Sequence, residues 1–168
     1  MGHRFKQASV QSIAPESKQV TLDDGTTLRY DFLVVALGAV DANYGVTGVD
    51  AHAFSFKSAA QCDAISDRLR TLQATAEASR VTIIGAGITG VEALGEVLRQ
   101  GTPGNLKITV LEAQTQLLPN SPKGLDNYIR SLCEPYPVEF RCNETAQRIR
   151  QKSVLLGSGK SLSSDLTI

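Results

Sequence analysis

A G-x-G-x-x-G pattern at residues 85–90, between an expected strand and an expected helix, constrains the fold more than any other feature. Residues 81–84 before it are all β-branched, and residues 91–99 after it place valine and leucine on one helical face. A second apolar segment, residues 106–111, ends at Glu112. Strand, glycine turn, helix and strand in this order predict a right-handed βαβ unit, and therefore a parallel sheet.

Each glycine of the pattern has a separate physical role in a nucleotide-binding turn. Gly85 permits a tight turn out of the strand, Gly87 leaves the backbone open to a pyrophosphate, and Gly90 lets the helix lie close to the sheet. The N–H groups of residues 88–91 lack intrahelical partners and face an anion with the positive end of the helix dipole. The pattern predicts a dinucleotide site. The alternative is a glycine-rich turn that is packed within a βαβ unit and binds no nucleotide.

The acidic residue at the end of the second strand favours NAD(H) over NADP(H). Glu112 follows the last glycine by roughly 20 residues, the spacing at which a carboxylate accepts hydrogen bonds from the adenosine ribose. A 2′-phosphate would be repelled there, and residues 113–118 (AQTQLL) contain no Arg or Lys to bind one. The alternative for Glu112 taken singly is a solvated carboxylate at a strand end.

Composition and spacing argue against several classes of function. Lys+Arg and Asp+Glu both number 17, so the formal net charge is zero and no global field favours nucleic acid. The longest apolar stretch, residues 32–40, is too short to cross a bilayer. Two histidines and three widely spaced cysteines predict neither a metal site nor a disulfide framework, and no residue is singled out as catalytic. The expected location is cytoplasmic.

Further elements are expected on both sides of the βαβ unit. Residues 32–37 form a continuous apolar run, which is typical of a strand covered on both faces. Ser58 is expected to cap a helix at residues 59–75. Other strands are expected at residues 8–13, 19–22, 26–30, 138–140, 146–150 and 154–156, and another helix at residues 123–133.

Residues 81–96 (VTIIGAGITGVEALGE) resemble the NAD-binding segment of FAD-dependent pyridine nucleotide-disulfide oxidoreductases, most closely the type II NADH dehydrogenase branch. Residues 20–39 resemble the β-meander of the FAD domain and the strand beneath the flavin nucleotide. Residues 154–168 resemble the segment that returns to that domain. The resemblance implies a parent enzyme that positions NADH for hydride transfer to flavin.

The resemblance also implies a role for the first of two glutamates on the helix after the glycines. Glu92 would reach toward the nicotinamide side of the cofactor; the alternative is an acid favoured by the helix dipole. Glu96 shares that helix face, and a basic partner in the parent's other domain would make the two like charges tolerable. The residues expected to bind the cofactor are Gly85, Ala86, Gly87, Ile88, Thr89, Gly90, Glu92 and Glu112.

The chain departs from the family pattern in the motifs that would hold FAD. It has neither the first G-x-G-x-x-G nor the late Gly-Asp motif, and no C-x-x-C redox pair. We therefore interpret it as an internal segment, with residues 1–51 a partial FAD-domain β-meander and linker and residues 52–168 the NAD(H)-binding domain. The expected partner is the FAD domain of the parent. By itself the segment is expected to bind no FAD and to be inactive, and the parent is expected at the inner face of the membrane without a transmembrane segment.

The predicted fold is α/β: a Rossmann-like, mostly parallel sheet with flanking helices, preceded by a short antiparallel β appendage. Two other functions remain open. One is a non-catalytic dinucleotide-binding or interaction module. The other is a disulfide, ferredoxin or sulfide-type flavin reductase of the same fold.

Overall fold

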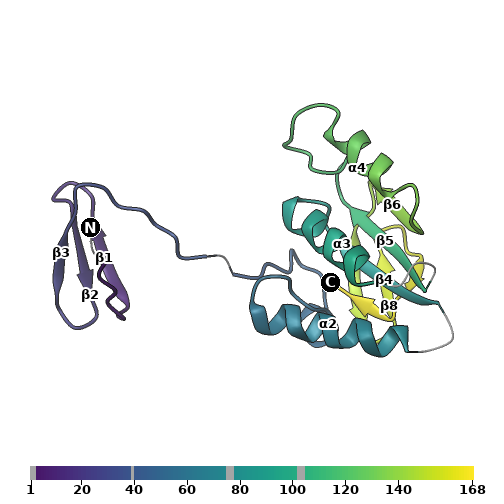
Figure 1. Cartoon of the computed structure of the whole chain (residues 1–168), viewed down its shortest axis with the longest axis horizontal. Coiled ribbons are helices and arrows are strands. Elements are labelled where there is room, and N and C mark those ends of the chain that lie inside the picture. Colours follow the sequence, from purple (N-terminus) through teal and green to yellow (C-terminus); the bar gives the residue numbers. More distant parts are fainter. Residues whose placement is uncertain (1–2, 39, 75–77, 102–104) are drawn as a thin grey trace. The chain divides into compact units, whose positions relative to one another are not determined.

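The computed structural model describes residues 3–38, 40–74, 78–101 and 105–168 (Figure 1). The chain divides into two compact units, Met1–Ala39 and Val40–Ile168. Two predicted positions lie outside the described residues: Ala39, at the end of the segment that resembles the FAD domain, and Thr75, at the end of a predicted helix.

The first unit is an antiparallel sheet with strand order β1-β2-β3. Its strands are β1 (Val10–Ala14), β2 (Gln19–Leu22) and β3 (Thr27–Arg29). Gly25 has φ +78° in the turn between β2 and β3, where the Asp24 carboxylate accepts the Thr26 N–H at 2.8 Å. Lys6 Nζ donates to the same carboxylate at 2.8 Å. The predicted antiparallel appendage is thus confirmed.

The buried strand predicted at residues 32–37 is not formed. Phe32, Val34 and Leu37 are 94%, 85% and 81% exposed, and no strand is assigned to these described residues. A strand that is apolar on both faces is stable only where other elements cover both faces. The described part of this unit supplies no such cover.

The second unit is built around a parallel sheet with strand order β10-β4-β5-β6 (Figure 1). Its strands are β4 (Ser79–Ile84), β5 (Leu106–Glu112), β6 (Val138–Cys142) and β10 (Leu166–Thr167). Its helices are α1 (Val49–His52), α2 (Ala59–Gln73), α3 (Ile88–Gln100) and α4 (Leu125–Cys133). The order β4-α3-β5 with parallel pairing confirms the predicted βαβ unit, and the α/β fold with it.

An antiparallel sheet of three strands follows β6 in the sequence. It consists of β7 (Ala146–Arg150), β8 (Ser153–Leu156) and β9 (Ser161–Ser163), in that order. The strands predicted at residues 146–150 and 154–156 are β7 and β8. The predicted helix at 123–133 is α4, which begins two residues later.

Both faces of the parallel sheet are covered. Ile83 and Val110 belong to a core cluster with residues of α2, α3 and α4, such as Leu69 and Leu94. Their strand neighbours Ile84 and Leu111 belong to a second cluster with residues of β7 and β8. Because adjacent residues of a strand point to opposite faces, helices cover one face and the antiparallel sheet covers the other. This cover explains why the central strands lack polar alternation.

Two local features shape the start of the second unit. Ser58 caps α2 as predicted, since its Oγ accepts the Gln61 N–H at 3.3 Å. Before it, the Thr47 N–H donates to the Gln147 carbonyl at 3.1 Å, and Val49 packs against the second core cluster. The second unit therefore begins before the domain boundary that the sequence predicts between residues 51 and 52. That boundary concerns the division of function between residues 1–51 and 52–168, and it stays a prediction.

An ion pair joins the start of β4 to the turn before β10. Asp165 accepts hydrogen bonds from the Arg80 backbone N–H and Nε, each at 3.0 Å, and from Nη2 at 3.2 Å. These bonds hold the pKa of Asp165 below its ordinary value. The Asp165 side chain is 16% exposed, so solvent screens this pair less than a surface pair.

We expect Asp165→Asn to lower the free energy of unfolding by about 1–2 kcal/mol at neutral pH. A carboxylate with a lowered pKa in the folded state stabilises the protein above the unfolded pKa, about 4, and this contribution disappears as pH falls through the folded pKa. The difference from wild type should therefore shrink in acid. Urea unfolding followed by circular dichroism at several pH values measures it. The control is Glu139→Gln, in the more exposed pair with Arg141; an equal loss in both variants would contradict the prediction.

Candidate functional site

The glycine turn lies where the two central strands end. The parallel register pairs Ile84 with Leu111. Gly85 directly follows Ile84 and Glu112 directly follows Leu111, so both lie at the same edge of the sheet. The Gly85 N–H continues the ladder by donating to the Leu111 carbonyl at 2.8 Å. The carboxyl ends of neighbouring parallel strands are where ligands bind in open α/β sheets.

The structure of the turn requires glycine at two of the three positions, for two different reasons. Gly85 has φ +94°, a left-handed conformation that other residues rarely adopt. A Cβ on Gly90 would lie 1.9 Å from the Gly85 carbonyl oxygen. The same Cβ would lie 3.8 Å from the Ile83 side chain of β4, so α3 runs close to the turn and to the strand before it.

Gly87 differs from the other two glycines. Its φ of −69° is open to any residue, and a Cβ built on it would meet no atom within 4 Å. Neither backbone conformation nor packing within the described chain therefore requires glycine here. Glycine is among the residues favoured at the N-cap of a helix, and its missing side chain also leaves the exposed backbone open to a group that approaches it closely.

Helix α3 begins at this open backbone without a side-chain cap. Gly87 is its N-cap, and the first intrahelical bond runs from the Val91 N–H to the Gly87 carbonyl at 3.0 Å. The expectation that the Val91 N–H has no intrahelical partner is therefore wrong. Helix geometry leaves the N–H groups of Ile88, Thr89 and Gly90 without one. Gly87, Ile88 and Thr89 are exposed, so the positive end of the helix dipole faces solvent.

Glu112 is buried against the glycine turn. It is 7% exposed; its Oε2 accepts the Ala86 N–H at 2.7 Å and its Oε1 accepts the Gln114 N–H at 2.8 Å. The alternative of a solvated strand-end carboxylate is therefore wrong. Ala86 is completely buried and its backbone N–H already donates to Glu112. That N–H is therefore occupied, whereas the N–H groups at the start of α3 belong to exposed residues.

The segment after β5 folds back over the turn. The Leu118 N–H donates to the Ala86 carbonyl at 2.9 Å, and the Leu117 N–H donates to Asp126 Oδ1 at 3.0 Å. Asp126 is itself held by Arg130 one helical turn along α4, with Nε at 3.0 Å. The sequence analysis did not identify Asp126 or Leu118, because no local pattern signals a bond between a loop and a helix that follows it.

The two glutamates on α3 have different surroundings. Glu92 is exposed in the first turns of the helix. Glu96 forms an ion pair with Arg99 and accepts from Gln100 Nε2 at 2.7 Å. The hydrogen bond from Arg99 is the main reason why the pKa of Glu96 falls to about 2. A basic partner for one of the two glutamates was considered in the parent's other domain; Glu96 has one on its own helix, since residues three apart share a helix face.

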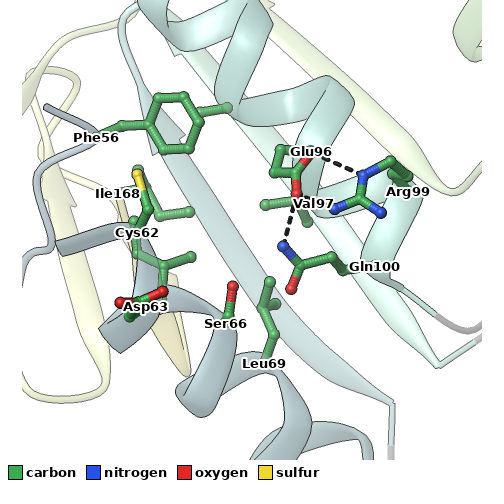
Figure 2. Close-up of a pocket in the computed structure, with 12 residues that line it drawn as sticks. Phe56, Cys62, Asp63, Ser66, Leu69, Glu96, Val97, Arg99, Gln100 and Ile168 are labelled. Atoms are coloured by element: carbon green, nitrogen blue, oxygen red, sulfur yellow. Dashed lines mark hydrogen bonds and ion pairs between the residues drawn. The ribbon is translucent and has the colours of Figure 1, made fainter. Parts of the chain in front are cut away.

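A cavity of about 340 Å³ lies between α2 and α3, away from the glycine turn (Figure 2). Phe56, Cys62 and Ile168 line one side, and Glu96 and Gln100 line the other. None of residues 85–90 lines it, and neither does Glu112. The residues predicted to bind a dinucleotide gather instead at the carboxyl edge of the parallel sheet.

Within residues 3–38, 40–74, 78–101 and 105–168, no group of three or more His, Cys, Asp or Glu side chains is placed to hold a metal ion. Over the same residues, every helix is too short or too polar to cross a membrane.

Comparison with known proteins identifies the family. Residues 3–168 match the family described as pyridine nucleotide-disulphide oxidoreductase. The chain belongs to this family. Among curated relatives, the type II NADH:quinone oxidoreductase of Staphylococcus aureus strain NCTC 8325 is 33% identical over 164 aligned residues, covering 83% of this chain. The alignment covers 40% of that relative, so the chain spans about two fifths of its length.

Solved structures of other reductases share the fold of this family member. A ferredoxin reductase from Rhodopseudomonas palustris has a TM-score of 0.72 at 20% identity, covering 96% of this chain and 39% of its own. The NDH2 of Plasmodium falciparum in complex with NADH has a TM-score of 0.66 at 20% identity, covering 97% of this chain and 39% of its own.

We expect Gly90→Ala to destabilise the protein by about 1–3 kcal/mol, because its Cβ forces the helix away from the Gly85 carbonyl. The matched control is Gly95→Ala on the same helix, where a Cβ meets nothing within 4 Å. That change should stabilise by about 0.5–1 kcal/mol through helix propensity. Chemical denaturation of both variants provides the comparison. Similar stability of the two variants would contradict the close approach at Gly90.

Proposed function

We propose that residues 52–168 are the NAD(H)-binding domain of a FAD-dependent NADH dehydrogenase, and that residues 1–51 comprise part of its FAD domain and a linker. The open backbone at Gly87 carries this proposal, because its conformation and surroundings would accept a side chain that an incoming pyrophosphate would not. The family to which the chain belongs and its NADH:quinone oxidoreductase relatives support it. When bound, NADH would supply a hydride to the flavin of the parent.

The residues of this chain would bind and orient the dinucleotide. The exposed N–H groups of Gly87, Ile88 and Thr89 would donate to the pyrophosphate, which the positive end of α3 attracts. Gly85 and Gly90 would shape the turn, with Ala86 enclosed behind it. Glu112 lies at the strand end where the adenosine ribose is expected, and Glu92 would orient the nicotinamide half from the first turns of α3.

The proposed partner of this chain is the remainder of the FAD domain in the parent. The exposed apolar residues Phe32, Val34 and Leu37 support this, because a covering sheet would bury them and complete the strand predicted there. Since the chain has neither FAD motif, we propose that it holds no FAD on its own. A cytoplasmic location, with the parent attached peripherally to the inner face of the membrane, is part of the same proposal.

A quinone is the proposed electron acceptor of the parent. The relatives that share 33% of their aligned residues are named NADH:quinone oxidoreductases. The ferredoxin reductase structure is only 20% identical in sequence, so its similarity to this chain concerns the fold alone.

Titration calorimetry with three ligands tests the proposed site. We expect the chain to bind NADH at least about tenfold more tightly than NADPH, a difference of about 1.4 kcal/mol, and to bind no FAD. The acidic Glu112 beside the expected ribose position disfavours a 2′-phosphate. Equal affinity for NADH and NADPH would refute the cofactor preference, and tight FAD binding would refute the assignment of the glycine turn.

The variant Gly87→Val tests the observation on which the proposal depends. Because the valine side chain would occupy the space left open at Gly87, we expect NADH binding to be lost while the circular dichroism spectrum is retained. The control is Gly95→Ala, which lies further along α3 and should bind as wild type does. Micromolar affinity for NADH in Gly87→Val would contradict a pyrophosphate site at this position.

A further inference from the structure

Both oxygens of the Glu112 carboxylate accept a hydrogen bond from the protein itself. One oxygen accepts the Ala86 N–H at 2.7 Å and the other accepts the Gln114 N–H at 2.8 Å. Ala86 is completely buried and Glu112 nearly so, which makes these charge-assisted bonds costly to lose. A carboxylate that only awaited ribose hydroxyls would need neither bond.

These bonds complete a set that fixes the glycine turn. The Gly85 N–H donates to Leu111 at 2.8 Å, and the Ala86 carbonyl accepts from Leu118 at 2.9 Å. Glu112 binds the one remaining polar backbone group of Ala86, its N–H. The conformation that presents Gly87 and the start of α3 to solvent therefore depends on a side chain from the neighbouring strand.

We propose that Glu112 is a positioning residue that holds the glycine turn in its anion-binding conformation, whether or not it also meets the ribose. This inference rests on the proposed dinucleotide site. It predicts that the carboxylate contributes to binding the diphosphate part of a ligand, which it does not touch. A ribose acceptor alone would contribute only through the ribose hydroxyls.

The isosteric variant Glu112→Gln separates these roles. Its side chain keeps one oxygen acceptor but turns an NH₂ group toward one of the two backbone donors. The matched control is Glu144→Gln, because the Glu144 carboxylate also accepts a backbone N–H, that of Ser158 at 3.2 Å in the turn between β8 and β9. The Glu144 backbone N–H donates to the Glu112 carbonyl at 3.0 Å, and the substitution leaves that bond in place.

Amide hydrogen exchange measured by NMR on the unliganded chain is the first readout. We expect the exchange of the Ala86 or Gln114 amide to rise at least about tenfold in Glu112→Gln and to stay unchanged in Glu144→Gln. The amides of Val81 and Ile108 in the core report global unfolding in the same spectra. Unchanged exchange at both Ala86 and Gln114, or an equal rise at the core amides, would overturn the proposal.

A pair of ligands provides the second readout. ADP carries the ribose hydroxyls, whereas 2′,3′-dideoxy-ADP lacks them and keeps the diphosphate. We expect Glu112→Gln to weaken the binding of 2′,3′-dideoxy-ADP by about tenfold, and that of ADP by at least as much. Weakening of ADP alone would assign Glu112 to the ribose and overturn the positioning role. If wild type binds neither ligand, the proposed dinucleotide site fails, while the exchange measurement still decides whether Glu112 holds the turn.

Discussion

The parallel pairing of β4 with β5 is the constraint on which the rest of the second unit depends. Its register, with Ile84 opposite Leu111, brings the ends of both strands to one edge of the sheet. The glycine turn leaves one strand there and Glu112 terminates the other. A parallel pair also requires a crossover, and α3 provides it, so the N-terminus of that helix lies at the same edge, directly after the glycine turn. A shift of this register would separate the carboxylate from the turn that it holds.

Cover on both faces determines which apolar segments become strands. β4 and β5 lie between a helical layer and an antiparallel sheet, and their alternate residues enter two different core clusters. Residues 32–37 have the same apolar character but remain exposed and form no strand. Apolarity is therefore a requirement for a central strand, and the packing partner decides whether the strand forms.

The electrostatics of the candidate site depend on which backbone N–H groups form hydrogen bonds within the protein and which do not. The buried Ala86 N–H is satisfied by Glu112, as buried polar groups generally must be. The exposed N–H groups at the start of α3 have no side-chain cap and are left to solvent or to a ligand. A negative side chain thus stabilises the interior of the turn, while the outer face remains positive. This division allows an acidic residue and an anion site to lie side by side.

Local sequence determined the elements of the βαβ unit, the glycine turn between them and the acid at the strand end, because periodicity and backbone freedom act within a few residues. It also predicted the cap of α2 by Ser58. Tertiary structure alone decided that Glu112 meets Ala86, that Asp126 holds the segment over the turn, and that residues 32–37 remain uncovered. The choice of partner for a carboxylate or an apolar face depends on segments distant in sequence, and such contacts leave no local pattern.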